Sequence, residues 1–334
     1  MRLLFFTDSH IRATSPKSRK DDFFETILEK LDEILHEAVV RGAKAIIHGG
    51  DLFDRPDPSL VVVTEVAKRI MACPVPFYVV CGNHDIYGHN PETISRSMLG
   101  FLAAMNVVKL LDESPVFLEE GGMKVQLTGA PYTYEIDQHE NVSRNPYILR
   151  ERQEDVDVAI HVAHGFLVKD PVHPQIFHTL VEDIARDTLA DITLSGHFHY
   201  GFEKTYSEGK IFFNPGAIAR ISNSKKELGR MPQYVVITLE KDQEPQLETV
   251  VLTCAKPGEE VLDRIEMENH RFKQEKLQEF REGLQTTQVF QGTNVDALIA
   301  TIQAEQKTPQ EVVNEARARI DAVRLERKDD VWRP

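Results

Sequence analysis

The stretch "AKAIIHGGDLFD", residues 43–54, joins a short apolar run to two glycines and two carboxylates. The run before the glycines has the length and composition of a buried strand. Asp51 and Asp54 follow directly where that strand would end. Open α/β sheets place their functional groups in clefts beyond the carboxyl ends of the strands. The stretch therefore predicts a strand of an α/β sheet that delivers polar side chains to such a cleft.

The same alternation of strand and helix continues on both sides of this stretch. Further strand-like runs lie at 2–7 and 76–82, and helical spacing of apolar residues covers Asp21–Glu37, Ser59–Met71 and Glu92–Met105. This βαβαβα order predicts a sheet with covering helices. We therefore expect an α/β fold, in the form of an α+β sandwich with central β-sheets flanked by helices.

More strands follow in the middle of the chain. Short β segments between Val107 and Thr128 are separated by "EEGG", which predicts a hairpin turn. Further apolar strand patterns lie at 156–165, 191–199, 210–216, 233–240 and 246–253.

The composition changes after about Lys256. Residues 258–284 form a charged segment with helical period, and a second helix is expected near Asn294. A third begins at "TPQE", with Thr308 as N-cap and Pro309 as the first helical residue. We expect a main domain at 1–255 and a helical C-terminal region at 256–334. The helices either pack on the main domain or form a docking module for a partner protein.

Composition indicates a globular protein of the cytoplasm. Of the 334 residues, 41% are hydrophobic and 28% are charged, which suits a sizeable core. No stretch approaches the roughly 20 apolar residues of a membrane helix, so we expect no membrane association. Asp8 and His10 interrupt the apolar start too early for a signal peptide. The three cysteines lack C-x-x-C spacing, which argues against a disulfide framework and a zinc knuckle.

The formal net charge of −14 lowers the expectation of nucleic-acid binding, because such proteins usually carry a Lys/Arg surplus. The segments 15–20 and 223–230 are nevertheless locally basic. Bound divalent cations would add positive charge that the count omits. The net charge therefore does not exclude a nucleic-acid substrate.

Five short motifs follow predicted strands and carry the polar residues. They are TDSH with Asp8 and His10, GGDLFD with Asp51 and Asp54, GNHD with Asn83, His84 and Asp85, VAHG with His164, and GHFH with His197 and His199. Each motif alone is weak, since Gly and Asn also favour turns and a His-x-His pair can lie on a surface. Together they offer carboxylate and imidazole ligands without thiolate. Such a set suits Mn²⁺, Fe²⁺ or Zn²⁺ rather than an Fe–S cluster or a closed structural zinc site.

The order D-x-H, G-D-x-x-D, G-N-H-D, H, G-H-x-H resembles the calcineurin-like metallophosphoesterase superfamily over roughly residues 1–220. The spacing is most similar to the Mre11/SbcD DNA nuclease branch. The resemblance implies the metallophosphoesterase type of fold and two divalent metal ions, with Mn²⁺ first and Fe²⁺, Zn²⁺ or Mg²⁺ as alternatives. It also implies the ligands: Asp8, His10 and His199 for one ion, Asn83, His164 and His197 for the other, and Asp51 bridging both.

The resemblance further implies two catalytic residues. His84 would stabilise the transition state or protonate the leaving oxygen, and Asp54 would orient the His84 imidazole. The chain also departs from the branch. Archaeal and eukaryotic Mre11 proteins often carry His at the position of Asp54, the segment 214–220 is not a close match to the SbcD form, and no β-rich capping domain is evident after residue 255.

Three functions remain open from the sequence. The first is a DNA nuclease, exo- or endonucleolytic, in DNA repair, recombination or phage DNA metabolism. Its C-terminal helices would dock onto a Rad50/SbcC-like ATPase, and the chain could form a homodimer. The second is a phosphodiesterase or phosphatase for a small substrate such as a cyclic nucleotide; the net charge favours it slightly and the helical tail does not. The third is a metal-free scaffold, against which the seven intact ligand positions argue.

Several other residues near the motifs have less specific roles. His161 lies three residues before His164 and so points to the opposite face of its strand, where we expect it to be packed or hydrogen-bonded. His48 is expected in the core or behind the ligands. Tyr132 and Tyr134 either stack on a nucleic-acid base or serve packing.

Overall fold

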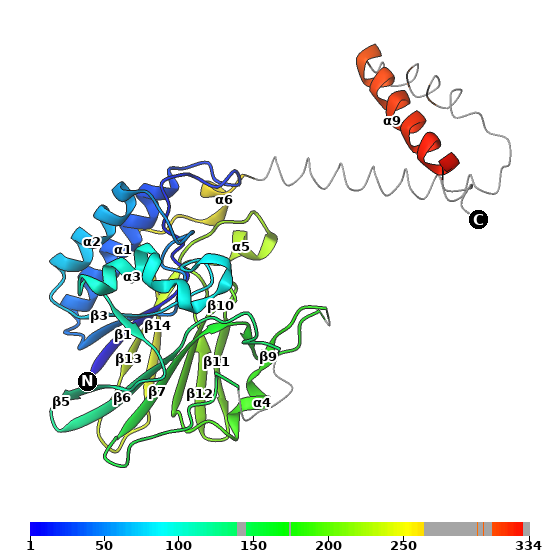
Figure 1. Ribbon diagram of the computed structural model, residues 1–334. Helices are drawn as coiled ribbons and strands as arrows, with labels where there is room; N and C mark the ends of the chain where they lie inside the picture. The colour runs from blue at the N-terminus through cyan, green and yellow to red at the C-terminus, as the bar shows by residue number, and fades with distance from the viewer. Residues whose placement is uncertain (139–144, 174, 264–298, 300–302, 304–308, 330–334) are drawn as a thin grey trace. The chain divides into compact units, whose positions relative to one another are not determined.

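A computed structural model of the chain describes all residues except 139–144, 174, 264–298, 300–302, 304–308 and 330–334 (Figure 1). The chain divides into two compact units, Met1–Met267 and Glu268–Pro334. No helix in the described part of the chain is both long enough and apolar enough to cross a bilayer.

The first of two six-stranded sheets contains the βαβαβα segment. Its strand order is β14-β13-β1-β2-β3-β4, and β1 to β4 run parallel while β13 and β14 are antiparallel. The strands are β1 (Arg2–Phe6), β2 (Ala45–His48), β3 (Phe77–Val80), β4 (Lys109–Leu111), β13 (Gln233–Thr238) and β14 (Gln246–Val251). The connecting helices are α1 (Phe23–Val40), α2 (Leu60–Ala72) and α3 (Met98–Ala104).

The second sheet has the order β11-β12-β10-β7-β6-β5. Its strands are β5 (Val116–Glu120), β6 (Met123–Ala130), β7 (Val158–Gly165), β10 (Ile192–His197), β11 (Phe202–Ser207) and β12 (Lys210–Asn214). The predicted hairpin joins β5 to β6. Gly121 and Gly122 form its turn, both with positive φ, as a two-residue hairpin turn requires.

Short elements complete the first unit. They are the 3₁₀ helices η1 (Tyr87–His89) and η2 (Pro91–Arg96), the strand pair β8 (Leu167–Val168) and β9 (Thr179–Leu180), and the helices α4 (Val181–Ala185), α5 (Lys225–Gly229) and α6 (Gly258–Val261).

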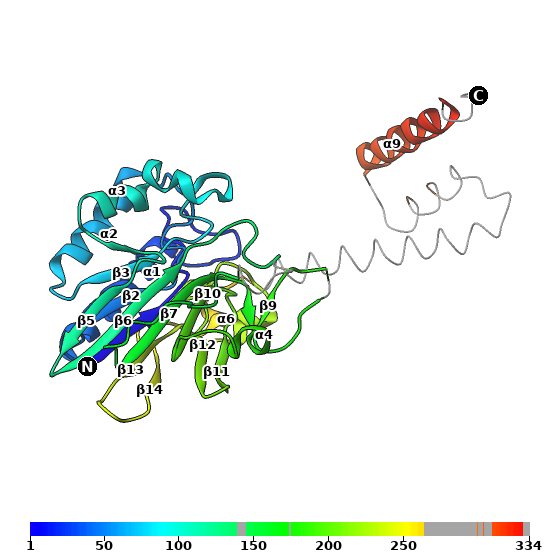
Figure 2. The ribbon, with the colours of Figure 1, turned by 60° about the horizontal axis from the view of Figure 1, so that its bottom comes forward.

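Strand alternation assigns each apolar residue to one of two cores. In β1, Leu3 and Phe5 belong to the cluster between the two sheets, whereas Leu4 and Phe6 belong to the cluster under the helices. The helices α1 to α3 accordingly lie on the outer side of the first sheet (Figure 2). The predicted sandwich of central sheets flanked by helices is confirmed.

The predicted helix from Glu92 to Met105 is wrong as one element. It consists of η2 and α3, separated by Ser97 in an extended conformation. The Ser97 hydroxyl accepts a hydrogen bond from the amide of Gly100, and the Met98 amide donates to the Pro56 carbonyl. Ser97 therefore caps the start of a new helix, α3. The apolar spacing alone predicts one continuous helix across this break.

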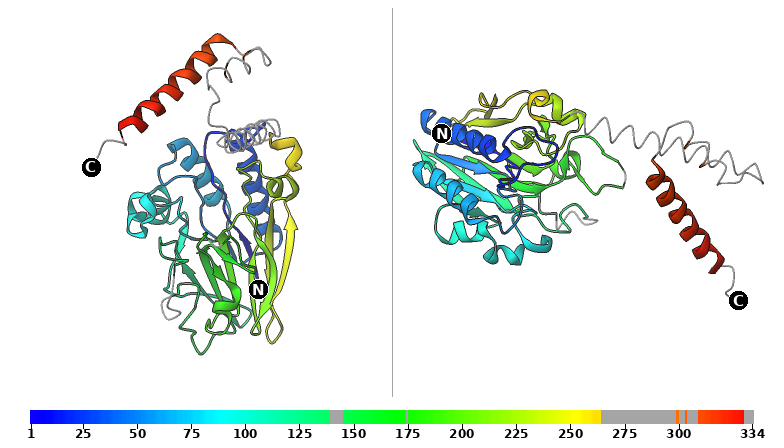
Figure 3. Two further views of the ribbon diagram at one scale, coloured as in Figure 1. Left: turned by 90° about the vertical axis from the view of Figure 1, so that its right-hand side faces the viewer. Right: turned by 90° about the horizontal axis from the view of Figure 1, so that it is seen from above.

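Of the predicted C-terminal helices, the third is confirmed as α9 (Gln310–Asp329; Figure 3). The N-cap Thr308, most of the segment 258–284 and the helix expected near Asn294 lie outside the described residues. Asp263 still belongs to the first unit, and its amide donates to the Ser18 carbonyl. The boundary between 255 and 256 stays a prediction.

A buried lysine of α1 fastens the loop that follows β12. The Lys30 ammonium donates to the Ile218 carbonyl at 2.7 Å, and Arg230 donates to the Ala219 carbonyl at 2.7 Å. The Ile218 and Ala219 amides in turn donate to the Thr7 and Asp8 carbonyls at the end of β1. Burial, with the nearby positive charges of three arginines, lowers the pKa of Lys30 from 10.5 to about 7.

We expect Lys30 to make stability depend on pH between about 7 and 10.5. Over that range the unfolded chain holds the lysine proton and the folded chain does not, so stability rises with pH, by up to about 1.4 kcal/mol per pH unit. Below pH 7 Lys30 is protonated in both the folded and the unfolded chain, so its burial lowers the free energy of unfolding by a constant amount. Urea unfolding at pH 7, 8 and 9 should show a smaller rise for Lys30→Met than for the parent. The exposed-lysine variant Lys68→Met should behave as the parent, and equal slopes for all three proteins would refute the assignment.

Candidate metal centre

The ends of five strands bring the motif residues together. In parallel strands the carboxyl ends meet at one edge of the sheet. The first sheet supplies Asp8, His10, Asp51, Asn83 and His84, and the second supplies His164, His197 and His199. Main-chain hydrogen bonds join the first two motifs, because the Asp8 and His10 amides donate to the Gly50 and Asp51 carbonyls at 3.1 and 3.0 Å.

One group of ligand atoms centres on two imidazoles. His10 Nε2 and His199 Nε2 lie 3.0 Å apart. Asp8 Oδ1 lies 3.5 Å from His199 Nε2 and 3.8 Å from His10 Nε2. Asp51 Oδ2 lies 3.6 Å from His10 Nε2. This is the set that the resemblance assigns to one metal ion.

A second group centres on the amide oxygen of Asn83. Its Oδ1 lies 2.9 Å from His197 Nδ1 and 3.1 Å from His164 Nε2. Asp51 Oδ2 lies 3.3 Å from His164 Nε2. The same Asp51 oxygen therefore borders both groups, as a bridging ligand must.

These spacings fit two cations. Oxygen and nitrogen ligands about 2.0–2.2 Å from one ion lie about 3.0–3.5 Å from each other in tetrahedral or octahedral geometry. The observed separations, 2.9 to 3.8 Å, are close to that range. His164 Nδ1 donates to the Gly49 carbonyl at 2.7 Å, which leaves Nε2 to face Asn83 and Asp51.

Four of the ligand residues have left-handed backbone conformations. Asp8, His10, Asp51 and His197 have φ values of 53°, 43°, 54° and 71°. Non-glycine residues rarely adopt such angles, and each costs of order 1 kcal/mol or more. Strained backbone of this kind gathers at functional sites. The concentration of strain at these four ligands supports a function for the cluster.

Burial and charge set the protonation of the site. Burial would lower the pKa of His164, but the carboxylates of Asp51 and Asp8 raise it to about 9. Burial would raise the pKa of Asp51, but His164 holds it well below its usual range. His197 is buried beside that positive charge, so its pKa falls to about 3. The negative carboxylates and the His164 imidazole therefore stabilise each other's charged forms within this cluster.

His84 lies beside the ligands. Its amide donates to Asp51 Oδ1 at 2.8 Å, and its ring meets the His10 ring edge-on at 4.7 Å between centroids. His84 Nδ1 donates to the main-chain carbonyl of Asp54 at 2.8 Å. The Asp54 carboxylate instead lies 2.7 Å from an Arg12 nitrogen and 3.6 Å from His10 Nδ1. Asp54 thus contacts the His84 ring through its backbone carbonyl, while its carboxylate faces Arg12 and His10.

Asp85 connects two of the motifs, a role that was not predicted from the sequence. Its buried carboxylate accepts the amides of Gly82 and Phe53 at 3.0 and 3.1 Å, which ties the third motif to the second. Burial, together with the nearby Asp51 charge, raises the pKa of Asp85 to about 7. The sequence signal for this role was the position of Asp85 as the last residue of the GNHD motif. Arg12, which follows the first motif and pairs with Asp54, was also missed.

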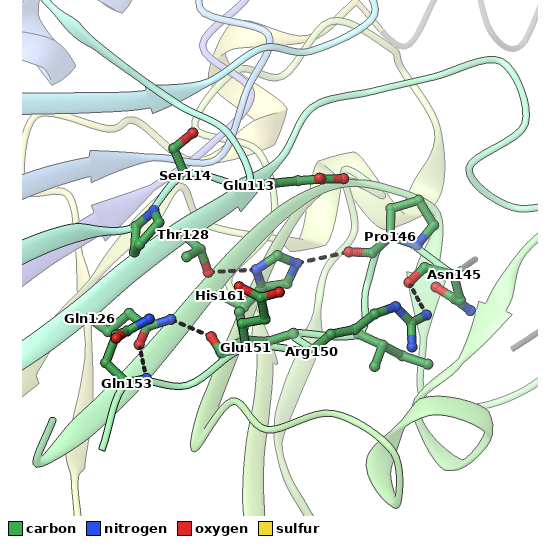
Figure 4. A pocket seen from close by; sticks show the side chains of 13 residues that line it. Glu113, Ser114, Gln126, Thr128, Asn145, Pro146, Arg150, Glu151, Gln153 and His161 are labelled. Atoms are coloured by element: carbon green, nitrogen blue, oxygen red, sulfur yellow. Dashed lines mark hydrogen bonds between the residues drawn. The ribbon is translucent and has the colours of Figure 1, made fainter. Parts of the chain in front are cut away.

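His161 lies away from the cluster, on the other face of β7, as predicted. Its ring is buried and hydrogen-bonded to the Thr128 hydroxyl at 2.9 Å and the Pro146 carbonyl at 2.8 Å, at the wall of a separate cavity of about 650 Å³ (Figure 4). His48 is buried as predicted and contacts the Ser9 hydroxyl at 2.8 Å. Tyr132 lies 5.5 Å from the His197 ring, whereas Tyr134 is exposed.

Gly50 leaves space for a metal ligand, so we expect Gly50→Ala to weaken binding at the second group. A Cβ at Gly50 would lie 2.1 Å from His164 Nδ1, and the residue has a φ of 102°. Gly42→Ala is the matched control, since its φ is also positive, at 62°, and a Cβ there meets nothing within 4 Å. Calorimetric Mn²⁺ titration should show a loss of at least about tenfold in affinity for Gly50→Ala only. Equal affinity in both variants would contradict this packing.

The two-sheet fold and its dimetal cluster of His and Asp residues define a metal-dependent phosphoesterase. The chain belongs to the calcineurin-like phosphoesterase family, whose model matches residues 1–201. A dimetal site of this composition is typical of that family.

Curated relatives with similar sequences include DNA double-strand break repair proteins Mre11. The protein from Sulfolobus acidocaldarius is 31% identical over 119 residues, which are 34% of this chain and 29% of the relative. The protein from Methanococcus maripaludis is 26% identical over 232 residues, 64% of this chain and 56% of the relative. The chain thus spans little more than half of these relatives at most. A solved dimetal phosphatase from Danio rerio has a TM-score of 0.47 and 13% identity, covering 76% of this chain and 99% of that one.

Proposed function

We propose that this phosphoesterase is a DNA nuclease of the Mre11/SbcD kind. It cleaves phosphodiester bonds, by exo- or endonucleolytic action, in DNA repair, recombination or phage DNA metabolism. The observation that carries the proposal is the similarity of the metal-site domain to DNA double-strand break repair proteins Mre11. The two ligand groups and the adjacent His84 supply what phosphodiester hydrolysis needs.

Two Mn²⁺ ions are the proposed cofactors, with Fe²⁺, Zn²⁺ or Mg²⁺ as alternatives. The first group (Asp8, His10, His199) would hold one, the second (Asn83, His164, His197) would hold the other, and Asp51 would be shared. When bound, such cations would supply activation of water and neutralisation of charge on the phosphoryl group.

His84 is the proposed catalytic residue of the chain itself. The Asp54 carbonyl can only accept a hydrogen bond, so it keeps a proton on Nδ1 of His84 and fixes the orientation of the ring. The opposite nitrogen, Nε2, is then the atom that exchanges a proton with the leaving oxygen. Asp54 is a positioning residue in this scheme, through its carbonyl toward His84 and through its carboxylate toward His10.

A small phosphodiester is the second candidate substrate, and the net charge of −14 is the observation that favours it. A polyanionic strand is repelled by that charge over distances near the Debye length, while a small diester is affected less.

One assay separates the candidates. Purified full-length chain with Mn²⁺ is offered single-stranded DNA, double-stranded DNA and bis-p-nitrophenyl phosphate, with EDTA as the matched control. The nuclease proposal predicts EDTA-sensitive cleavage of at least one DNA. Hydrolysis of the small diester without cleavage of either DNA would favour the second candidate. Absence of both bound Mn²⁺ and hydrolysis would favour the metal-free scaffold.

We also propose that the C-terminal region docks onto an ATPase of the Rad50/SbcC kind. The described helix α9 is strongly charged, with Val312 exposed near its start, which suits a surface that meets a partner. Light scattering of the full chain, alone and mixed with such an ATPase, tests both this complex and a homodimer. A mass that stays near 38.0 kDa in the mixture would contradict both.

A further inference from the structure

A row of aromatic side chains leads away from the metal centre. The Phe166 ring lies 5.8 Å from that of the ligand His197 and 5.0 Å from that of Phe198. Phe198 in turn meets Tyr200 edge-on at 5.6 Å. Phe198 stands between the ligands His197 and His199 in the sequence, so the row starts at the metal centre. We call Phe166, Phe198 and Tyr200 the aromatic row.

Two members of this row line a groove of about 420 Å³. Phe198 and Tyr200 form one part of its wall, and Val168, Pro171 and Val172 add apolar surface. A volume of this size is within the range of about 300–1,000 Å³ for small-ligand sites. It is sufficient for one nucleotide.

The groove also contains charges of both signs. Lys169 and Lys226 line it together with Asp170 and Glu203. The Lys226 ammonium lies 5.0 Å from the centroid of the Tyr200 ring, and the Tyr200 hydroxyl lies 3.1 Å from the Ser224 hydroxyl. These contacts hold the Tyr200 ring in place, although 37% of the residue is exposed. A fixed and partly exposed ring is suited to stacking.

We propose that this groove binds an unpaired nucleotide of the DNA strand that is cut, with its base stacked on the aromatic row and its phosphate near Lys169 or Lys226. The inference rests on the proposed nuclease function and specifies its substrate as a strand with unstacked bases. Aromatic stacking contributes about 1–3 kcal/mol per base and tolerates any sequence. A base within a duplex is already stacked on its neighbours and cannot use the row.

The test measures the affinity of the full-length chain for a labelled 12-nucleotide oligothymidine by fluorescence anisotropy, in Ca²⁺ without Mn²⁺. Tyr200→Leu is expected to raise the Kd by about 5- to 150-fold. Tyr200→Phe keeps the ring and should restore binding to within about twofold. The matched control is Tyr206→Leu, because Tyr206 is also exposed (58%) and also lies under a lysine, Lys204, but is outside the groove.

A blunt duplex of the same length gives the second arm. Its affinity should change less than about twofold in Tyr200→Leu, because its bases stay stacked. The proposal is overturned if Tyr200→Leu binds the single strand as the parent does, if it weakens the duplex equally, or if the parent does not bind the single strand.

Cleavage assays distinguish this failure from failure of the nuclease proposal. A parent that binds the single strand through Tyr200 but cleaves no DNA would contradict the nuclease and leave the groove supported. A parent that cleaves DNA while Tyr200→Leu keeps the parental Kd would contradict the groove alone.

Discussion

Replacing Asp51 with Asn is expected to reduce Mn²⁺-dependent hydrolysis of bis-p-nitrophenyl phosphate by about 10³-fold or more. The Asp51 carboxylate lies next to both ligand groups, at 3.6 Å from His10 Nε2 and 3.3 Å from His164 Nε2. An amide has no net charge to share between two cations, so bound Mn²⁺ should fall below two per chain. Asn keeps the oxygen that accepts the His84 amide, which preserves the local fold.

Metal content by mass spectrometry and the hydrolysis rate are both measured for this variant. Asp57→Asn is the matched control, because Asp57 lies on the same loop, has a side chain that is 43% exposed and forms an ion pair with Arg55. It should keep parental metal content and rate. Asp51→Asn protein with two Mn²⁺ and the parental rate would remove Asp51 from the centre.

His84→Gln is expected to lower kcat by about 10²–10⁴-fold with both metal ions retained. His84 contacts Asp51 through its amide, which the substitution keeps. A ring nitrogen of His84 also lies near ligand atoms of His10 and Asp51, but the seven proposed ligands complete both groups without it. The expected loss reflects the missing imidazole of the proposed catalytic residue. Asp51→Asn is thus expected to lose both activity and bound metal, whereas His84→Gln is expected to lose activity and keep its bound metal.

The measurement for His84 is kcat and Mn²⁺ content on the same preparation. His36→Gln, at an exposed position of α1, controls for the general effect of losing an imidazole. A loss of metal that parallels the loss of kcat would identify His84 as a ligand. Parental kcat would remove it from catalysis.

Local signals made most of the fold and the ligand set predictable. Each buried strand is a short apolar run, and the polar residues after β1, β2, β3, β7 and β10 follow directly in the sequence. Parallel strands bring such ends together without any knowledge of long-range contacts. Strand ends explain why the motif residues meet, whereas the choice of the seven proposed ligands came from the resemblance of the motif order to the calcineurin-like phosphoesterases.

Features that depend on tertiary contacts could not be predicted. The division of strands between two sheets, with β4 in one and β5 in the other, depends on pairing across the fold. The break at Ser97 is accompanied by a hydrogen bond from the Met98 amide to the carbonyl of the distant Pro56. The carboxylate of Asp54 faces Arg12 and His10 because of how two loops meet, which no motif encodes.

The origin of the ligands in both sheets has a thermodynamic consequence. Neither β1–β3 nor β7 and β10 contributes a full set for both ions, so the high-affinity state exists only when the two layers are joined. Ligand binding that is restricted to the native state stabilises it by mass action, by about 2.7 kcal/mol at a free concentration 100 times the Kd. The free cation concentration then sets the free energy of unfolding as well as the activity. Removing the cations would lower the stability of the folded protein and stop hydrolysis together.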